Sequence, residues 1–356
     1  MSFLASIRQH DTPIRVEIGQ TVLEAALAAG VPYPHGCRSG NCGACKSRLE
    51  SGEVEMMPFS EFALSAAERQ EGLILACRAV PWNDVSLAWL DADEVIVHPL
   101  RYLTCRVVAL DDATHDIKRL RLAIEAGGPF SFSPGQYAAL TFAGQAPRDY
   151  SMANRPDESE LEFHIRRTAG RGASVYAAET LRIGETVKVE GPFGSSFLRE
   201  KHTGPILAVA GGSGLAPIKS IVESALAAGM AQRIDLYVGV RAERDLYLED
   251  HFSAIASHHG NFRFIPVLSQ PAGATTRRCG FVHEAALADY PDLDGAKAYL
   301  AGPPVMVEAA TTALRARGMR RQDIHADAFY TEAEKAALLG ATQDGAEHRV
   351  AGETAA

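Results

Sequence analysis

The sequence predicts a multidomain protein with an α+β domain, an antiparallel β-barrel and an α/β domain built on a parallel sheet. Its 356 residues suggest two or three domains at about 100 to 200 residues each. Residues 1–92 alternate short strand-like runs with a helix, residues 98–202 carry closely spaced β-type runs bounded by Gly and Pro, and residues 203–330 alternate buried strands with helices. Residues 331–356 are rich in Ala, Glu and Gly, and we expect most of this tail to be disordered.

Composition and charge exclude several classes of protein. Lys and Arg number 35 against 44 Asp and Glu, a formal net charge of −9, whereas a nucleic-acid binder would show a basic face. The first residues contain no long apolar run of the kind a secretory signal has, and no stretch approaches the roughly 18 apolar residues of a membrane span. We therefore expect a cytoplasmic monomer that binds neither nucleic acid nor membrane.

The first segment contains a clear helix start. Residues 15–18 are typical of a strand, and Gly19 and Gln20 of a turn. Thr21 is a good N-cap, and Glu24 stands three residues later, which is the pattern of a capping box. We expect an Ala-rich helix that ends at Gly30.

Four of the six cysteines form one pattern. Three of them have the spacing Cys-x4-Cys-x2-Cys, and the fourth follows after 31 further residues. This spacing is that of a plant-type [2Fe–2S] cluster, in which three thiolates come from one tight loop. Gly36, Gly40 and Gly43 suit a loop that wraps closely around the cluster with its N–H groups aimed at sulfur. The predicted metal ligands are Cys37, Cys42, Cys45 and Cys77.

A structural zinc site is the alternative for these cysteines. Zinc sites usually pair two short CxxC-like clips, whereas this chain has three clustered cysteines and one distant one. We therefore favour iron–sulfur over zinc. Cys105 and Cys279 stand alone, and we expect them to be inert core thiols.

The barrel segment carries a candidate flavin site. In residues 148–151, with the sequence Arg-Asp-Tyr-Ser, the Arg can pair with a phosphate, the Tyr can lie on an isoalloxazine face and the Ser can reach a ring nitrogen. Residues 164–166 form another strand with a cation, and the Gly-rich residues 170–174 open a helix whose free N–H groups suit a pyrophosphate. Alone, the tetrapeptide could be an ordinary strand edge and the Gly-rich loop a surface turn, but their order along the chain favours a flavin site.

The third segment carries a candidate nicotinamide site. Residues 210–217 form a Gly-rich turn between a strand at residues 206–210 and a helix at 217–229, where backbone can approach a pyrophosphate. This is not the GxGxxG fingerprint. A second strand ends at Arg241, and a third, at residues 298–301, leads into Gly302, Pro303 and Pro304. Loops at the carboxyl ends of parallel strands are where such folds bind ligands.

Together these motifs resemble the ferredoxin–NADP reductase superfamily. More narrowly, residues 1–330 are similar to the single-chain reductases of Rieske ring-hydroxylating dioxygenases, such as those for benzoate, terephthalate and naphthalene, and of some diiron monooxygenases. Similar chains also act in CDP-deoxysugar synthesis. The resemblance implies a β-grasp ferredoxin at residues 1–92, a six-stranded FAD-binding barrel at 98–202 and an NAD(P)-binding α/β domain at 203–330.

The resemblance also implies roles for single residues. Tyr150 and Ser151 would be catalytic, with Ser151 near the flavin N5. The cofactor-binding residues implied for FAD are Arg148, Tyr150, Ser151, His164 and Arg166, with Gly172, Ala173 and Ser174 near its diphosphate. Those implied for the nicotinamide nucleotide are Gly211, Gly212, Ser213, Gly214, Arg241, Gly302 and Pro303. Phe329 would stack on the flavin if the tail leaves the site.

Two positions depart from the family pattern. Ala301 stands where relatives often have Cys, which would slow hydride transfer without removing it. Arg171 is displaced within the pyrophosphate turn, which weakens the case for a phosphate contact there.

The implied activity is electron transfer from NAD(P)H through FAD and a [2Fe–2S] cluster to an oxygenase component. Arg241 could pair with a 2′-phosphate and favour NADPH, but Glu243 is close by and related reductases mostly use NADH, so we favour NADH. A stand-alone NAD(P)H:flavin or quinone reductase and a redox-sensing iron–sulfur module are the rival hypotheses. The identity of the acceptor lies outside this chain.

Overall fold

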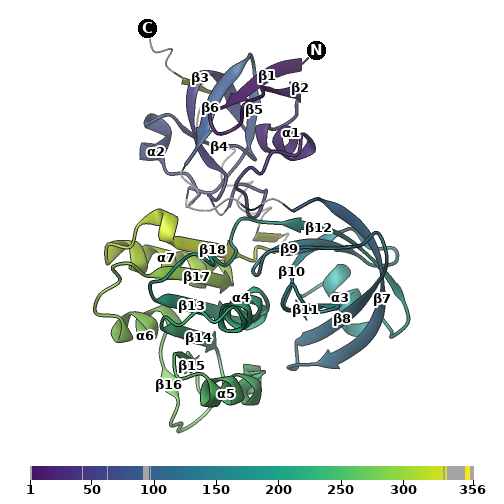
Figure 1. Ribbon diagram of the computed structural model, residues 1–356, viewed down its shortest axis with the longest axis vertical. Helices are drawn as coiled ribbons and strands as arrows, with labels where there is room; N and C mark the ends of the chain where they lie inside the picture. The colour runs from purple at the N-terminus through teal and green to yellow at the C-terminus, as the bar shows by residue number, and fades with distance from the viewer. Residues whose placement is uncertain are drawn as a thin grey trace. The chain divides into compact units, whose positions relative to one another are not determined.

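The computed structural model describes residues 2–41, 43–61, 63–90, 96, 98–331, 333–334 and 349–352 (Figure 1). The chain forms two compact units, one of residues 1–97 with 330–356 and one of residues 98–329. Among the helices of the described ranges, none is both long and apolar enough to cross a bilayer.

The first unit is a mixed sheet with α1 packed against it. The strand order is β19-β3-β6-β1-β2, and the long strand β3 also pairs with β4 and β5. β1 and β6 are parallel, whereas β3 is antiparallel to each of its partners. The elements are β1 (Ser2–Ile7), β2 (Ile14–Glu17), α1 (Val22–Ala28), β3 (Lys46–Met56), α2 (Ala66–Gln70), β4 (Leu73–Leu75), β5 (Ala79–Pro81), β6 (Val85–Trp89) and β19 (Arg349–Gly352).

The predicted capping box forms at the start of α1. The Glu24 N–H donates to Thr21 Oγ1 at 3.3 Å, and the Thr21 N–H donates to Glu24 Oε2 at 3.0 Å. Two backbone donors that the helix itself leaves unpaired are thus satisfied locally. Val22, Leu23 and Ala26 are buried in the core of the unit, so the helix is held by packing as well as by its cap.

The tail departs from the predicted disorder at one place. Residues Arg349–Gly352 form β19, which pairs antiparallel with residues 52–55 of β3. The second half of β3 would otherwise present an open edge of unpaired backbone groups, which a strand from the tail can satisfy. The rest of the predicted disordered tail, residues 335–348 and 353–356, lies outside the described residues.

In the second unit, the first half is a six-stranded antiparallel barrel. Its strand order is β10-β9-β12-β7-β8-β11, and an isolated bridge between Met152 and Phe163 joins the two edge strands. The predicted barrel is therefore present, with its core between the inward faces of the strands. The elements are β7 (Arg101–Asp112), β8 (Ile117–Ala126), β9 (Tyr137–Thr141), β10 (Arg148–Ser151), β11 (Glu160–Arg166), α3 (Ala173–Glu179) and β12 (Thr186–Phe193).

The second half of this unit is the predicted α/β domain. All strands of its sheet are parallel, in the order β16-β15-β14-β13-β17-β18. Helix α4 lies between this sheet and the barrel (Figure 1). The elements are β13 (Ile206–Gly211), the 3₁₀ turn η1 (Gly212–Gly214), α4 (Leu215–Ala227), β14 (Ile234–Val240), η2 (Glu243–Asp245), α5 (Glu249–His258), β15 (Phe262–Leu268), β16 (Arg278–Cys279), α6 (Val282–Asp289), β17 (Lys297–Gly302), α7 (Pro304–Ala316), η3 (Arg321–Asp323) and β18 (Ile324–Ala328).

The strand order fixes where this sheet can take a ligand. The chain runs outward from β13 through β14 to β16, and then returns to the other side of β13 with β17 and β18. The direction of winding therefore reverses between β13 and β17. Open α/β sheets bind ligands outside the carboxyl ends of the strands at such a switch point. β13 ends at Gly211 and β17 ends at Gly302, so two predicted nucleotide-binding segments meet there.

Deleting residues 349–356, which removes β19, should lower the stability of the first unit by about 1 to 3 kcal/mol, because a few backbone hydrogen bonds to β3 are lost. Thermal unfolding followed by circular dichroism measures this. Deleting only residues 353–356 is the control and should change nothing. An unchanged unfolding temperature in the longer deletion would show that β19 does not contribute to the fold.

Candidate electron-transfer sites

The predicted cluster loop is tightly turned around Cys37. The backbone is left-handed at Gly40, Gly43 and Arg38, with φ of 79°, 72° and 52°. A Cβ at Gly40 would come within 2.9 Å of the Phe59 Cβ, so this glycine is also required by packing. The Asn41 N–H donates to Cys37 Sγ at 3.3 Å. A backbone N–H aimed at a cysteine sulfur is the contact expected in a loop that stabilises thiolate ligands.

Two further predicted ligands lie deeper in the same unit. Cys45 and Cys77 are both buried, and the Ala76 N–H donates to the Cys45 carbonyl at 3.1 Å, which holds their segments together. Burial raises the pKa of the Tyr33 hydroxyl, and negative charge on the two nearby sulfurs raises it further. Both thiols therefore lie close to one buried phenol.

The fourth predicted ligand, Cys42, lies outside the described residues. Among the described residues, no three His, Cys, Asp or Glu side chains are grouped as a site for a single metal ion. Three of the predicted ligands can be placed, and a donor set of thiols with a backbone N–H aimed at one sulfur fits an iron–sulfur cluster.

In the second unit, the glycines of the predicted nucleotide turn pack backbone against backbone. A Cβ at Gly214 would collide with the Ala301 carbonyl, and one at Gly302 would come within 2.7 Å of the Gly211 carbonyl. Gly302 also has a φ of 141°, which disfavours any side chain. These glycines are therefore needed to bring the ends of β13 and β17 together, whether or not a nucleotide is bound. The Ala301 side chain is buried in the hydrophobic core.

Gly212 is partly exposed and lies close to a cation. Its φ is 55°, and the neighbour that a Cβ would meet is the Arg166 guanidinium, at 3.3 Å. Arg166 is also held by Asp116, whose Oδ2 accepts from Nε at 2.8 Å. Burial works to raise the Asp116 pKa, but hydrogen bonds from Thr114 and Arg166 outweigh it, so the pKa is lowered and the carboxylate stays charged. A positioned guanidinium beside a partly exposed Gly turn suits an anionic phosphate.

Ser151 lies where the barrel meets the nucleotide-binding sheet. Its hydroxyl donates to Asp327 Oδ2 at 3.4 Å, and Asp327 belongs to β18. Two residues later, the Phe329 N–H donates to the Gly302 carbonyl at 2.9 Å, and the half-buried Phe329 ring packs on the core of the nucleotide domain. The flavin motif, the late Gly-Pro turn and the end of β18 thus converge.

The remaining predicted flavin residues lie on β10 and at the start of α3. Tyr150 is half-buried beside Phe142, and burial raises the pKa of its hydroxyl, while Arg148 is exposed on the same strand. Gly172 begins the helix α3 that the sequence predicted, and Ser174 closes its loop through a 2.8 Å hydroxyl contact with Thr168.

His164 has a different environment from the one that its predicted role suggests. Its side chain is buried, with Nδ1 2.9 Å from the Tyr247 hydroxyl and Nε2 2.8 Å from Glu162 Oε1. Both ring nitrogens are thus engaged within the protein. The structure therefore gives this side chain a connecting role between barrel and nucleotide domain.

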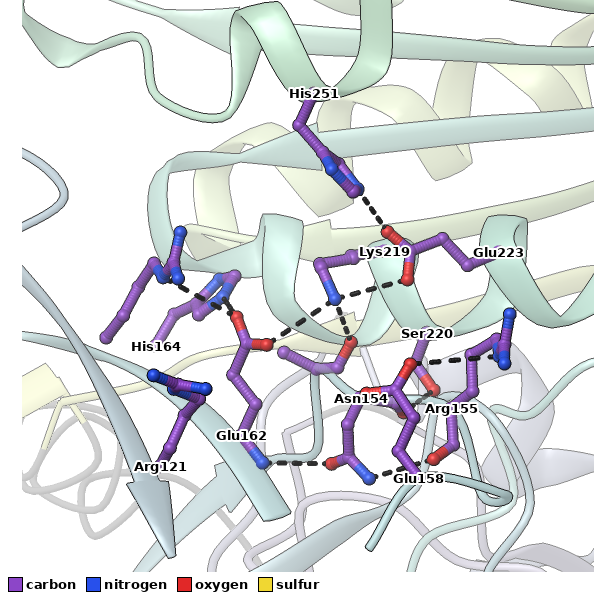
Figure 2. Close-up of polar contacts among 12 residues, drawn as sticks. Arg121, Asn154, Arg155, Glu158, Glu162, His164, Lys219, Ser220, Glu223 and His251 are labelled. Atoms are coloured by element: carbon purple, nitrogen blue, oxygen red, sulfur yellow. Dashed lines mark hydrogen bonds and ion pairs between the residues drawn. The ribbon is translucent and has the colours of Figure 1, made fainter. Parts of the chain in front are cut away.

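A network of charged side chains joins the two halves of this unit (Figure 2). Lys219 of α4 points at the barrel, with Nζ 3.1 Å from the Ala153 carbonyl, 3.2 Å from Glu223 and 3.5 Å from Glu162. Beside it, the Ser220 hydroxyl donates to the Asn154 carbonyl at 2.7 Å. The lysine is 6 % exposed, so these partners replace its lost hydration.

Glu162 is the centre of that network. Burial works to raise its pKa, but His164, Lys219 and Arg119 together lower the pKa to about 2. The carboxylate therefore remains charged in the interior. Glu162, Lys219, Tyr247 and Asp327 could not be predicted as functional residues, because none of them belongs to a local motif. Glu162 and Asp327 each stand two residues before a predicted site residue, His164 and Phe329 respectively.

Three family models match the chain in order. A 2Fe-2S iron-sulfur cluster binding domain matches residues 7–81, an oxidoreductase FAD-binding domain matches 104–197, and an oxidoreductase NAD-binding domain matches 208–312. The NAD(P)(+) reductase component of the naphthalene 1,2-dioxygenase/salicylate 5-hydroxylase systems of a Ralstonia species is 40% identical over 320 residues, covering 89% of this chain and 95% of its own length. The chain belongs to this family of oxygenase reductase components.

Other members of the family serve different systems. The phenol 2-monooxygenase reductase component of a Pseudomonas species is 37% identical, over 94% of this chain and 97% of its own length. The crystal structure of an Amycolatopsis cytochrome P450 reductase is 39% identical with a TM-score of 0.77, over 92% of this chain and 98% of its own. The present chain is therefore an NAD(P)H-dependent oxidoreductase with FAD and a [2Fe–2S] cluster.

Replacing Glu162 by Gln should destabilise the second unit of the reductase by about 2 to 4 kcal/mol, because the buried Lys219 loses one counter-charge. The pH dependence of the stability should change as well. A carboxyl whose folded pKa is below its unfolded value stabilises the fold above about pH 4.5, and this contribution is lost as pH falls from there toward about 2.

Urea unfolding at pH 7 and at pH 4 measures both effects. The variant should lose less stability than the wild type between these pH values. Glu158→Gln, on the exposed rim of the same network, is the control (Figure 2). Equal losses in the wild type and in Glu162→Gln would contradict a charged buried Glu162.

Proposed function

We propose that the chain takes electrons from NADH and passes them one at a time to the oxygenase component of an aromatic ring-hydroxylating dioxygenase system. The observation that most strongly supports this is the edge at which Ser151 of the barrel, the turn at Gly212 and Asp327 of β18 come together. A flavin motif beside the switch point of a nucleotide-binding sheet is the arrangement that hydride transfer requires.

The residues at this edge fit FAD. When bound, FAD can accept a hydride and release its electrons one at a time. Arg148 and Tyr150 would hold the flavin, and Arg166 would meet the diphosphate together with the turn at residues 172–174. In support, Arg166 is fixed by Asp116, so its guanidinium needs no further ordering to receive a phosphate.

Ser151 acts as the residue that faces the flavin N5. Because its hydroxyl donates to Asp327, its oxygen keeps lone pairs that can accept from a protonated ring nitrogen. Asp327 is thus the positioning partner that fixes the direction of the hydroxyl. Tyr150, whose raised pKa keeps it neutral, orients the ring without adding charge.

The nucleotide turn comprises Gly211, Gly212, Ser213 and Gly214, with Gly302 and Pro303 beside the nicotinamide. The close approach of the strand ends supports this, since Gly214 is buried there while Gly212 stays partly exposed. Ala301 offers no thiol or hydroxyl toward the edge, and its burial explains why a small apolar residue is tolerated there.

The oxygenase partner is inferred from the relatives. The naphthalene 1,2-dioxygenase reductase component of Pseudomonas putida is 39% identical over 98% of its length, which supports a dioxygenase. The match to the phenol 2-monooxygenase reductase component keeps a monooxygenase partner as the second candidate. A stand-alone flavin or quinone reductase would have no use for the cluster loop, and a redox sensor would have no use for the nucleotide edge.

We also place the protein in the cytoplasm as a monomer. The described cysteines form no disulfide, as expected in a reducing compartment. Gel filtration of the purified chain with light scattering tests the oligomeric state.

Changing Cys77 to Ser should separate the two halves of the electron path. We expect NADH-dependent reduction of cytochrome c, a one-electron protein acceptor, to fall by about tenfold or more, because its electrons leave through the cluster. Ferricyanide reduction, which flavin can support directly, should stay within about twofold. Cys279→Ser is the control, because Cys279 stands alone and is exposed, contrary to the core position that the sequence predicted for it. Equal loss of both activities would contradict a cluster that follows the flavin.

NADH should be preferred over NADPH by about tenfold or more in kcat/KM, because the described residues near the end of β14 form no unpaired cluster of cations for a 2′-phosphate. Arg241 is exposed at the end of β14, but Arg277, in the loop beside it, is held by Glu249 in two bonds of 2.6 and 3.0 Å. Steady-state kinetics with both donors measure the ratio. Glu249→Gln, which releases Arg277, should shift it toward NADPH. Equal use of both donors by the wild type would contradict this assignment.

A further inference from the structure

Tyr247 connects the barrel to the nucleotide turn through its hydroxyl. The hydroxyl is buried, 2.9 Å from His164 Nδ1 and 3.3 Å from the Gly212 carbonyl. On its other side, His164 Nε2 is 2.8 Å from Glu162. A chain of contacts at hydrogen-bond distance thus runs from a barrel carboxylate to the carbonyl of Gly212 in the nucleotide turn.

The number of protons in this chain allows two arrangements. A charged carboxylate only accepts, so His164 Nε2 must carry a proton toward Glu162. In neutral His164, Nδ1 is then an acceptor, and the single Tyr247 proton goes to it, which leaves the Gly212 carbonyl without a donor from Tyr247. In protonated His164, Nδ1 donates to the Tyr247 oxygen, and the Tyr247 proton goes to Gly212. One added proton on His164 therefore redirects the Tyr247 O–H from His164 of the barrel to the Gly212 carbonyl of the nucleotide turn.

We propose that Tyr247 is a positioning residue for dinucleotide binding, whose hydroxyl bonds the Gly212 carbonyl when nucleotide binding brings a proton to His164. This inference rests on the proposed function, which places the nucleotide diphosphate at that turn. Protonation adds one proton to the imidazole and redirects the existing hydroxyl hydrogen, so no covalent bond between heavy atoms changes.

The charges around His164 and Tyr247 determine how readily His164 is protonated. Besides Glu162 on its own strand, His164 faces Lys219 of α4 and Arg119 of β8, and these cations oppose its protonation. Burial lowers the pKa of His164 as well, so the imidazole is neutral in the absence of nucleotide. Asp116 adds negative charge near Tyr247. A diphosphate at Gly212 adds more negative charge and favours the protonated form.

Two consequences follow for nucleotide binding. Binding should take up a proton, so affinity should rise as pH falls through the range in which His164 of the complex titrates. The Tyr247 hydroxyl should contribute to affinity for the nucleotide and not to the chemical step, because it touches the turn and no reacting atom.

The test uses the full-length FAD-loaded protein and its Tyr247→Phe variant. Calorimetric titration with NAD⁺ in buffers of different ionisation enthalpy gives the number of protons taken up on binding, and NADH–ferricyanide kinetics give KM and kcat. We expect proton uptake in the wild type and its loss in the variant. We also expect KM to rise about fivefold, as for one net hydrogen bond, with kcat nearly unchanged.

Tyr237→Phe is the matched control. Tyr237 is also a buried tyrosine of the nucleotide domain, but its hydroxyl donates to Asp289, away from the turn. It should leave proton uptake and KM as in the wild type. His164→Gln is the second variant, because it keeps a donor for Glu162 but removes the titrating ring. It should abolish the pH dependence of affinity.

Equal proton uptake and equal KM in the wild type and Tyr247→Phe would overturn the inference while leaving the proposed function in place. Wild-type protein that binds neither NAD⁺ nor NADH would overturn the proposed function, and this inference with it. A fall in kcat at constant KM would also overturn it, since Tyr247 would then act on the chemical step.

Discussion

The buried ion pair between Lys219 and Glu162 is the interaction on which the geometry of the second unit depends. It ties α4 of the nucleotide domain to β11 of the barrel, in an interior where neither charge can be hydrated. Burying such a pair costs free energy, so the pair adds little to stability. Its main effect is to fix one arrangement of the barrel against the nucleotide domain. The positions of Ser151 against Asp327 and of Arg166 against Gly212 both follow from that arrangement.

Glycine has two separate uses at the switch point. Gly214 and Gly302 let backbone touch backbone, so they are required for the strands to meet at all. Gly212 is instead partly exposed and lies against a guanidinium, which suits a position that binds an anion. The glycines at the ends of β13 and β17 therefore serve both the closure of the fold and the proposed place of the ligand.

In the cysteine loop of the first unit, adjacent residues likewise serve both packing and the proposed cofactor site. Gly40 packs under Phe59 while the adjacent Asn41 N–H is aimed at Cys37, so loop packing and sulfur hydrogen bonding are set together. Residues from the end of the chain return to this unit. The Tyr330 hydroxyl donates to the Asn41 carbonyl at 3.2 Å, and β19 covers part of β3. Within the predicted disordered tail, residues 349–352 are thus a strand of the ferredoxin unit.

The sequence by itself determined the three folds, their order and the cofactor motifs, because strand and helix periodicity, capping boxes, cysteine spacing and Gly-rich turns are local patterns. The capping box at Thr21 and the turn at Gly212 could be predicted for that reason. The tertiary structure alone decided the partners of isolated polar residues. Tyr247, Lys219 and Asp327 carry no local signal, and His164 proved to be engaged on both ring nitrogens. Their roles arise only when strands distant in the sequence bury them together, where each lost bond to water must be replaced by a protein partner.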